Sequence, residues 1–191
     1  MNTRTALLNS AERAARQRGY NGFSYADLAR DIGIRKASIH HHFPTKADLA
    51  FELIQRYAAR FSDLLNDLSG SDLSAAERLQ AHQAIYRDAL VDGSQLCLCV
   101  ALSASRDRLA DPVIAELNQF HEDSVAWLTQ VFETARQDRS VAGVTDPSAE
   151  AHATLALMEG AQLVARAAKT VSLFDRATAA FLARLTGSTQ T

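Results

Sequence analysis

A segment between residues 23 and 49 carries cationic and hydrogen-bonding side chains on two short amphipathic stretches. The first stretch follows Ser24 and ends at Gly33, and the second extends from Arg35 to His42, just before Pro44. Two short helices that meet at a glycine form a helix-turn-helix, which can insert its second helix into the major groove of DNA. The chemistry predicted for this segment is therefore the recognition of duplex DNA.

The predicted recognition helix has an inner and an outer face. At about 100° per residue, Ile39 and Phe43 point the same way and are expected to anchor the helix to a core. Arg35 and Lys36 suit contacts with phosphate or guanine, and Lys46, which opens the next helix, suits a phosphate. The start of the preceding helix adds the Ser24 hydroxyl and the Tyr25 phenol, and the outer face of the recognition helix adds small groups, a hydroxyl and imidazoles. The predicted DNA contacts are therefore Ser24, Tyr25, Arg35, Lys36, Ala37, Ser38, His40, His41 and Lys46.

The run His40–His42 raises the question of a metal site. Consecutive helical residues point about 100° apart, so three adjacent imidazoles cannot converge on one ion. The other histidines, His82, His121 and His152, are not spaced four residues apart either. The sequence therefore predicts neither a metal site nor a cofactor.

The charge of the chain is unevenly distributed. Residues 1–50 contain eight lysines and arginines against four acidic residues, whereas the whole chain has a net charge of −2. A basic head on an acidic body suits a DNA-binding protein, although such a split also arises by chance. No apolar run approaches the roughly 18 residues that span a bilayer, no secretory signal is apparent, and only two cysteines occur, so we expect a cytoplasmic protein without membrane contact.

Every regular hydrophobic pattern in the chain has the helical period, so the predicted fold class is all-α. A first helix ends near Gly19, and a long helix after Thr45 is striped with apolar residues down to Leu68. Together with the two helices of the helix-turn-helix, the further predicted helices at 74–92, 97–106, 111–138, 148–169 and 172–186 give nine. We expect a DNA-binding domain at residues 1–47 and an effector-binding and dimerisation domain at residues 48–191.

Four motifs follow one another within residues 5–60: Gly-Tyr-Asn-Gly-Phe-Ser, Asp-Leu-Ala, Gly-Ile-Arg-Lys-Ala-Ser-Ile, and His-His-Phe-Pro-Thr-Lys-Ala-Asp-Leu. This succession resembles the TetR family of bacterial transcriptional regulators. The resemblance implies a nine-helix architecture and a homodimer on a near-palindromic operator, usually a repressor that a small ligand releases. His40 takes the position where the family usually has a tyrosine that touches the DNA backbone or a thymine methyl group.

The last two predicted helices are expected to form the dimer interface. The first of them is rich in small side chains, which allow a close helix approach, and the second has an apolar stripe. Ordinary packing within one chain is the alternative, but a twofold reader of DNA needs a partner. The predicted interface residues are Ala153, Gly160, Val164, Phe174, Phe181 and Leu185.

An effector pocket is expected inside the body of the protein, among the helices from the fourth to the eighth. Small-molecule pockets combine apolar and aromatic walls with a few polar groups. Each candidate has plain core packing as its alternative. The predicted pocket residues are Tyr86, Cys97, Val100, Phe120, His121, Trp127 and Met158.

The pair Cys97 and Cys99 suggests a sensor of oxidants or electrophiles, because some TetR-like regulators with a cysteine in this region respond to such compounds. Side chains two residues apart on a helix point about 200° apart, so a disulfide between them requires local unwinding. The alternative for each cysteine is a small buried hydrophobic residue.

The function predicted from these features is a DNA-binding transcriptional regulator, and specifically a repressor that a small effector releases from its operator, with thiol-reactive compounds as one candidate class of effector. The sequence contains no nucleophile with a base, no phosphate-binding glycine loop and no metal-ligand spacing, so we do not expect an enzyme. The alternative is a small-molecule-binding or enzymatic helical protein whose helix-turn-helix is only architectural.

Overall fold

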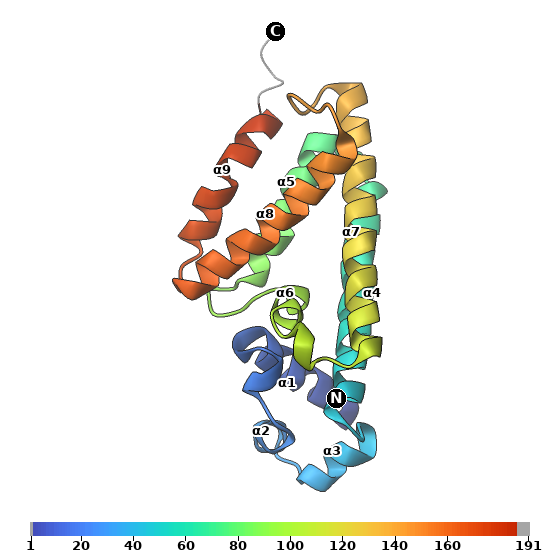
Figure 1. Ribbon diagram of the computed structural model, residues 1–191, viewed down its shortest axis with the longest axis vertical. Coiled ribbons are helices and arrows are strands. Elements are labelled where there is room, and N and C mark those ends of the chain that lie inside the picture. The colour runs from blue at the N-terminus through green and yellow to red at the C-terminus, as the bar shows by residue number, and fades with distance from the viewer. Residues whose placement is uncertain (1, 187–191) are drawn as a thin grey trace. The chain divides into compact units, whose positions relative to one another are not determined.

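The computed structural model describes residues 2–186, and within this range it contains nine α-helices, two short 3₁₀ helices and no β-strand (Figure 1). The predicted all-α fold class and the number of helices are confirmed for these residues. The elements are α1 (Thr3–Arg18), η1 (Tyr20–Gly22), α2 (Tyr25–Ile32), α3 (Lys36–His42), α4 (Lys46–Ser69), α5 (Ala75–Ala89), α6 (Leu98–Ser103), η2 (Arg106–Arg108), α7 (Asp111–Asp138), α8 (Pro147–Ala167) and α9 (Ser172–Thr186).

Local sequence explains where several helices begin. Three of them start with a hydroxyl residue and an acidic residue three positions later, whose carboxylate accepts a hydrogen bond from the backbone N–H of the capping residue. This arrangement satisfies backbone groups that the helix itself leaves without partners. The three pairs are Ser24 and Asp27 for α2, Thr45 and Asp48 for α4, and Ser74 and Glu77 for α5.

The contacts of the chain divide it into two compact units. The first contains the residues up to Arg60 together with Leu96–Phe120, and the second contains Phe61–Gln95 and the residues from His121 onward. The first unit therefore holds the helix-turn-helix together with α6. The functional division at residue 47 that the sequence suggests stays a prediction.

Helix α1 is the centre of packing in the first unit, where it contacts α2, η1 and α6. Its Leu7 and Ala11 are fully buried, because apolar residues at helical spacing share one face. Polar contacts add to this packing: the Ser10 hydroxyl donates to Asp31 Oδ2 at 2.5 Å, and Arg13 pairs with the same oxygen at 2.6 Å. The helix-turn-helix is thus held from behind by α1.

In the second unit, α8 packs against α9, and both contact α5. Phe174 of α9 is completely buried there. The buried amides of this unit have partners: Gln83 Nε2 donates to Thr178 Oγ1 at 3.1 Å, and Gln162 Nε2 donates to the Tyr86 carbonyl at 2.6 Å. Each of these two buried amides therefore has a hydrogen-bond partner within the unit.

Two further observations concern residues 2–186 only. No helix in this range is long and apolar enough to cross a membrane. No group of three His, Cys, Asp or Glu side chains in it is arranged to hold a metal ion.

Candidate nucleic-acid interface

The turn between α2 and α3 depends on Gly33. This residue has φ 74° and ψ 33°, in the left-handed region that residues with a Cβ rarely adopt, and its N–H donates to the Ala29 carbonyl. The left-handed cap ends α2, so α3 begins only three residues later, at Lys36. The sequence prediction of a helix-glycine-helix unit matches these bounds.

Helix α3 presents its polar side to solvent and its apolar side to the head. Ile39 and Phe43 are buried, as the helical spacing predicts. Among the described residues, the side chains of Arg35 and Lys36 take part in no ion pair or hydrogen bond, so both cations remain available to an external anion. The exposed residues of this face are Arg35, Lys36, Ala37, Ser38, His40 and His41.

At the start of α2, the capping residue Ser24 is already hydrogen-bonded to a side chain of the same helix. The Ser24 hydroxyl and backbone N–H donate to Asp27 Oδ2 at 2.7 and 2.9 Å, and these hydrogen bonds lower the pKa of the Asp27 carboxyl. Ser24 itself is exposed. A contact between Ser24 and phosphate stays a prediction, and it has to compete with a carboxylate that is already in place.

Tyr25 does not face solvent, so the prediction that its phenol reaches DNA is wrong for this structure. Its side chain is buried, and its hydroxyl lies 2.9 Å from the Phe43 carbonyl oxygen and 2.5 Å from that of Thr45. Burial raises the pKa of Tyr25 to about 12, so the phenol stays a donor. His40 packs its ring edge to face against Tyr25, with 4.9 Å between ring centroids, and its Nδ1 lies 3.1 Å from the Pro44 carbonyl oxygen.

Lys46 is likewise engaged within the head, which corrects the prediction that it is a free phosphate contact. Its ammonium group donates to the Tyr20 and Phe23 carbonyl oxygens at 2.5 and 2.6 Å. It also lies 4.6 and 4.2 Å from the centres of the Tyr20 and Phe23 rings. Burial lowers the pKa of Lys46. These contacts join the start of α4 to the segment before α2, because Tyr20 belongs to η1 and Phe23 directly follows it.

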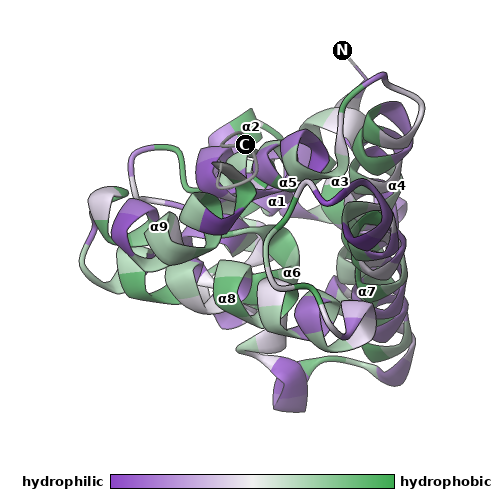
Figure 2. Cartoon of the chain, turned by 90° about the horizontal axis from the view of Figure 1, so that it is seen from above, coloured by the Kyte–Doolittle hydropathy of each residue, from purple (hydrophilic) through white to green (hydrophobic). Residues whose placement is uncertain are grey.

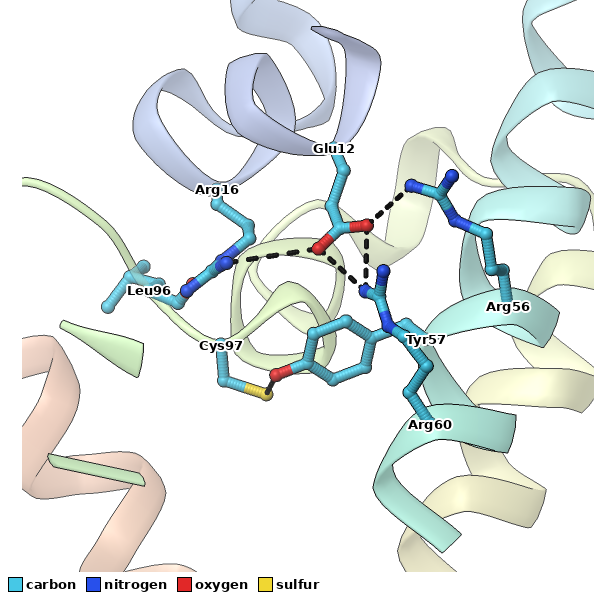
Figure 3. Close-up of polar contacts among 7 residues, drawn as sticks. All are labelled: Glu12, Arg16, Arg56, Tyr57, Arg60, Leu96 and Cys97. Carbon is cyan, nitrogen blue, oxygen red and sulfur yellow. Dashed lines mark hydrogen bonds and ion pairs between the residues drawn. The ribbon is translucent and has the colours of Figure 1, made fainter. Parts of the chain in front are cut away.

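A buried carboxylate joins α1 to α4 (Figure 3). Glu12 Oε2 accepts from Arg56 at 2.8 Å, and both carboxylate oxygens accept from Arg60 at 2.8 Å. Arg16 lies 3.8 Å from Oε1. We call these four residues the Glu12 network. The burial of Glu12 could have been inferred from the sequence, since Glu12 follows Leu8 by four residues on the apolar stripe of α1.

Arg16 also connects α1 to the segment before α6 (Figure 3). Its Nε donates to the Leu96 carbonyl at 2.8 Å, and the Leu96 N–H donates back to the Arg16 carbonyl at 3.1 Å. The two hydrogen bonds fix Leu96 against the last turn of α1, one residue before Cys97.

Cys97 is a buried thiol at the start of α6, and the Tyr57 hydroxyl donates to its sulfur at 3.2 Å (Figure 3). Burial by itself raises the pKa of Cys97, but hydrogen bonds from Cys99, Tyr57 and the backbone amides of Val100 and Cys99 together lower it to about 7. Burial raises the pKa of Tyr57 well above its ordinary value, so the phenol keeps its proton for the sulfur. Within the described part of the chain, neither Cys97 nor Cys99 forms a disulfide.

Comparison with known proteins identifies this arrangement. The sequence model described as "Bacterial regulatory proteins, tetR family" matches residues 7–53. The crystal structure of a TetR-family transcriptional regulator from Agrobacterium tumefaciens is 30% identical, with a TM-score of 0.90, over 96% of this chain and 97% of that chain. The chain belongs to the TetR family. The predicted resemblance is thereby confirmed.

Other TetR-family relatives match along nearly the whole length. A TetR transcriptional regulator from Legionella pneumophila is 29% identical, with a TM-score of 0.85, over 96% of both chains. The HTH-type transcriptional repressor NemR of Escherichia coli K12 is 25% identical over 190 residues, which cover 93% of this chain and 90% of NemR. The crystal structure of the reduced form of E. coli NemR has a TM-score of 0.78 and covers 94% of this chain and 95% of that chain.

The residues predicted to line the effector pocket of this TetR-family protein fall in both units. Cys97, Val100 and Phe120 are buried in the first unit. The second unit holds the buried Tyr86, Trp127 and Met158, together with the half-buried His121, whose Nε2 lies 3.1 Å from Glu159 Oε1. A shared role in binding a ligand stays a prediction.

The predicted dimer residues separate into two groups. On α8, Ala153, Gly160 and Val164 are exposed, and the neighbouring Leu163 is 45% exposed. Figure 2 shows hydrophobic residues along α8 and α9. The three predicted residues of α9 are buried within their own unit, so their contact with a partner subunit stays a prediction: Phe174, Phe181 and Leu185. The apolar stripe of α9 packs inside its own chain.

Proposed function

We propose that this TetR-family regulator is a transcriptional repressor that binds a near-palindromic operator as a homodimer and leaves it when a small molecule binds. The outer face of α3 carries the proposal, because two cations without internal partners stand beside a hydroxyl and two imidazoles on a helix anchored by Ile39 and Phe43. Cations bind phosphate and position the helix, while hydroxyl and imidazole groups read base edges.

A gel-shift with the DNA upstream of the protein's own gene tests this proposal. Binding should fall steeply as salt increases, with half-sites about 34–36 Å apart or a multiple of that distance. Lys36→Met should weaken binding to every sequence and reduce the salt slope by about one, whereas Ser38→Ala should change the base preference. Arg176→Met, which removes an exposed cation of α9, is the matched control and should leave binding unchanged. Equal losses in the Lys36 and Arg176 variants would contradict the proposed interface.

The proposal includes a thiol-reactive effector that acts on Cys97. The hydrogen bond from Tyr57 and a pKa of about 7 favour the thiolate, which is the reactive form of cysteine. With an α,β-unsaturated aldehyde, the sulfur forms a bond to the β-carbon and the thiol proton ends on the α-carbon, so no oxidant is consumed. The added group cannot fit at a buried sulfur without displacing its neighbours.

Treatment with acrolein, followed by the gel-shift, tests this part of the proposal. Operator binding should weaken in the wild type and in Cys99→Ser, and it should persist in Cys97→Ser. Mass spectrometry of the treated protein locates the adduct. Loss of binding in the Cys97 variant after treatment would remove Cys97 from the proposal without affecting the repressor assignment.

The proposal excludes an enzymatic role, since the relatives that match over nearly the whole chain are named as regulators or repressors. A protein that binds an operator must share a compartment with the chromosome, so the proposal includes a cytoplasmic location. Its partners are an operator duplex, a second copy of the chain and a small effector.

A further inference from the structure

Four ring side chains from three helices form a buried cluster in the second unit. His82 and Tyr86 come from α5, Phe61 from α4 and Trp127 from α7. The His82 and Trp127 rings are stacked, with centroids 5.5 Å apart and planes at 21°, while the His82 and Tyr86 centroids are 5.0 Å apart. Phe61 meets His82 and Tyr86 edge to face, at 6.3 and 5.9 Å. We call this group the His82 cluster.

His82 is the residue of the cluster that packing alone does not explain. Its side chain is completely buried, and within residues 2–186 neither Nδ1 nor Nε2 has a hydrogen-bond partner. The neighbouring Trp127 shows the usual solution, since its indole N–H donates to Ser69 Oγ at 2.8 Å and to the Leu65 carbonyl at 3.1 Å. Buried polar groups are normally paired, so an imidazole with two unpaired nitrogens indicates that a partner from outside the chain belongs there.

The chemistry of the imidazole defines that partner. Burial lowers the pKa of His82 to about 4, so near neutral pH the ring is uncharged, with one N–H donor and one bare nitrogen acceptor. A hydroxyl group can donate to the bare nitrogen or accept from the N–H. The ring neighbours of His82 are Phe61, Tyr86 and Trp127, none of which carries a charge, so an ionised ligand would lose its hydration without compensation.

We infer that His82 recognises a second, non-covalent effector, separate from the thiol-reactive compound proposed for Cys97, and that this second effector is an uncharged aromatic molecule with a hydroxyl group, that is, a phenol. The inference rests on the proposed ligand-controlled function and names the ligand class. The stack of His82 on Trp127 has nearly parallel planes, so a flat ring enters the cluster there by widening the stack. The hydroxyl of the phenol then lies at the edge of the imidazole.

Three probes with the same ring test the inference: para-ethylphenol, para-ethylanisole and para-ethylbenzoate. They present a hydroxyl, a methylated oxygen that only accepts, and a carboxylate. Binding is measured by isothermal titration calorimetry and by the fluorescence of Trp127, the single tryptophan of the chain. The phenol should bind about tenfold more tightly than either of the other probes, which is the discrimination expected of one buried hydrogen bond.

The variant His82→Phe keeps an aromatic ring in the stack and removes both nitrogens. It should fold, and it should bind the phenol and the anisole equally, so that the tenfold preference is lost. His152→Phe, at an exposed histidine of α8, is the matched control and should keep the preference. If His82→Phe does not fold, His82→Leu and His82→Gln replace it, and the preference should be lost in the former and partly kept in the latter.

Equal affinity of the wild type for the phenol and the anisole would overturn the inference, as would a preference for the benzoate or binding of none of the probes. If the only partner of His82 is an ordered water, the wild type should bind the phenol and the anisole with equal affinity. Operator binding is measured in parallel without any probe. If it is intact while the probes fail, the inference about His82 is wrong and the proposed repressor stands; if operator binding itself is absent, the proposed function fails separately.

Discussion

Two buried ionisable side chains, one in each unit, differ in whether they have hydrogen-bonding partners. Glu12 in the first unit is 8% exposed, and its carboxylate meets three arginines, two of them at 2.8 Å. His82 in the second unit is fully buried, and no residue in the described part of the chain pairs with its nitrogens. Both side chains lose hydration on folding, but only Glu12 recovers it through partners.

The difference separates a structural group from a functional one. A buried charge with complete pairing holds elements in place, and removing one partner leaves the others uncompensated. A buried polar group without pairing costs stability, and replacing it by an apolar group of the same shape removes that cost. The Glu12 network therefore stabilises the DNA-binding head, while His82 lowers stability in the second unit in exchange for recognition of a ligand.

The largest expected effect is on Glu12. Glu12→Ala should lower the free energy of unfolding by about 4 kcal/mol, because it leaves the largely buried Arg16 and Arg56 and the half-exposed Arg60 without their common carboxylate. Chemical denaturation measures the change. Glu52→Ala removes the partner of Arg4 in an exposed pair and should cost no more than about 1 kcal/mol. Similar losses in both variants would show that the Glu12 network is no stronger than a surface pair.

The second largest expected effect is a loss of stability at acidic pH that is caused by His82. Its pKa is about 4 in the folded chain against 6.5 when exposed, so above pH 6.5 the imidazole is neutral in both states and contributes nothing. As the pH falls from 6.5 to 4, His82 becomes protonated in the unfolded chain but stays largely neutral in the folded chain. The free energy of unfolding therefore falls by about 3 kcal/mol. The difference between wild type and His82→Phe, measured across this range, isolates the effect. A constant difference would mean that His82 is not buried as a neutral group.

The two lysines of the head should separate stability from DNA binding. Lys46→Met should lower the free energy of unfolding by about 1–2 kcal/mol, because two carbonyl contacts and two ring contacts are lost. Lys36→Met, at an exposed site, should stay within about 0.5 kcal/mol of wild type and should weaken operator binding instead. Denaturation and gel-shift on both variants decide this, and the reverse pattern would restore Lys46 as the phosphate contact.

The smallest expected effect is that of His82→Phe at neutral pH. Removing two buried nitrogens without partners should raise the free energy of unfolding by about 1 kcal/mol, even though the phenyl ring is slightly larger. Thermal denaturation at neutral pH measures the gain. A loss of several kcal/mol would show that the imidazole is already paired in the ligand-free protein and would remove the contrast with Glu12.

The sequence predicts the fold well because helical periodicity and caps are local signals. The helix predicted at 111–138 is observed as Asp111–Asp138, and the one predicted at 172–186 as Ser172–Thr186. The short helix expected at 97–106 is instead Leu98–Ser103, followed by η2. Its end differs because the α-helix stops at Ser103, with Ala104 as its cap, and the polar residues that follow form a separate 3₁₀ turn.

The sequence predicts the candidate site less completely, because periodicity gives the face of a side chain but not the destination of its polar end. Ile39 and Phe43 point inward as their spacing requires. Lys46 and Tyr25 reach backbone carbonyl groups of neighbouring segments, which a helical wheel cannot show. For the same reason the apolar stripe of α9 does not reveal whether it faces its own chain or a partner, and Phe174 proves to face its own.

The reciprocal hydrogen bonds between Leu96 and Arg16 have a consequence for signalling. Leu96 is joined to Cys97 by a single peptide bond and to the final turn of α1 by two hydrogen bonds. A group attached to the Cys97 sulfur is thus one residue away from the backbone that carries the helix-turn-helix. Chemical modification at that sulfur would need no relay of side chains to be felt by the operator-binding head; a change in the direction of one peptide plane would suffice.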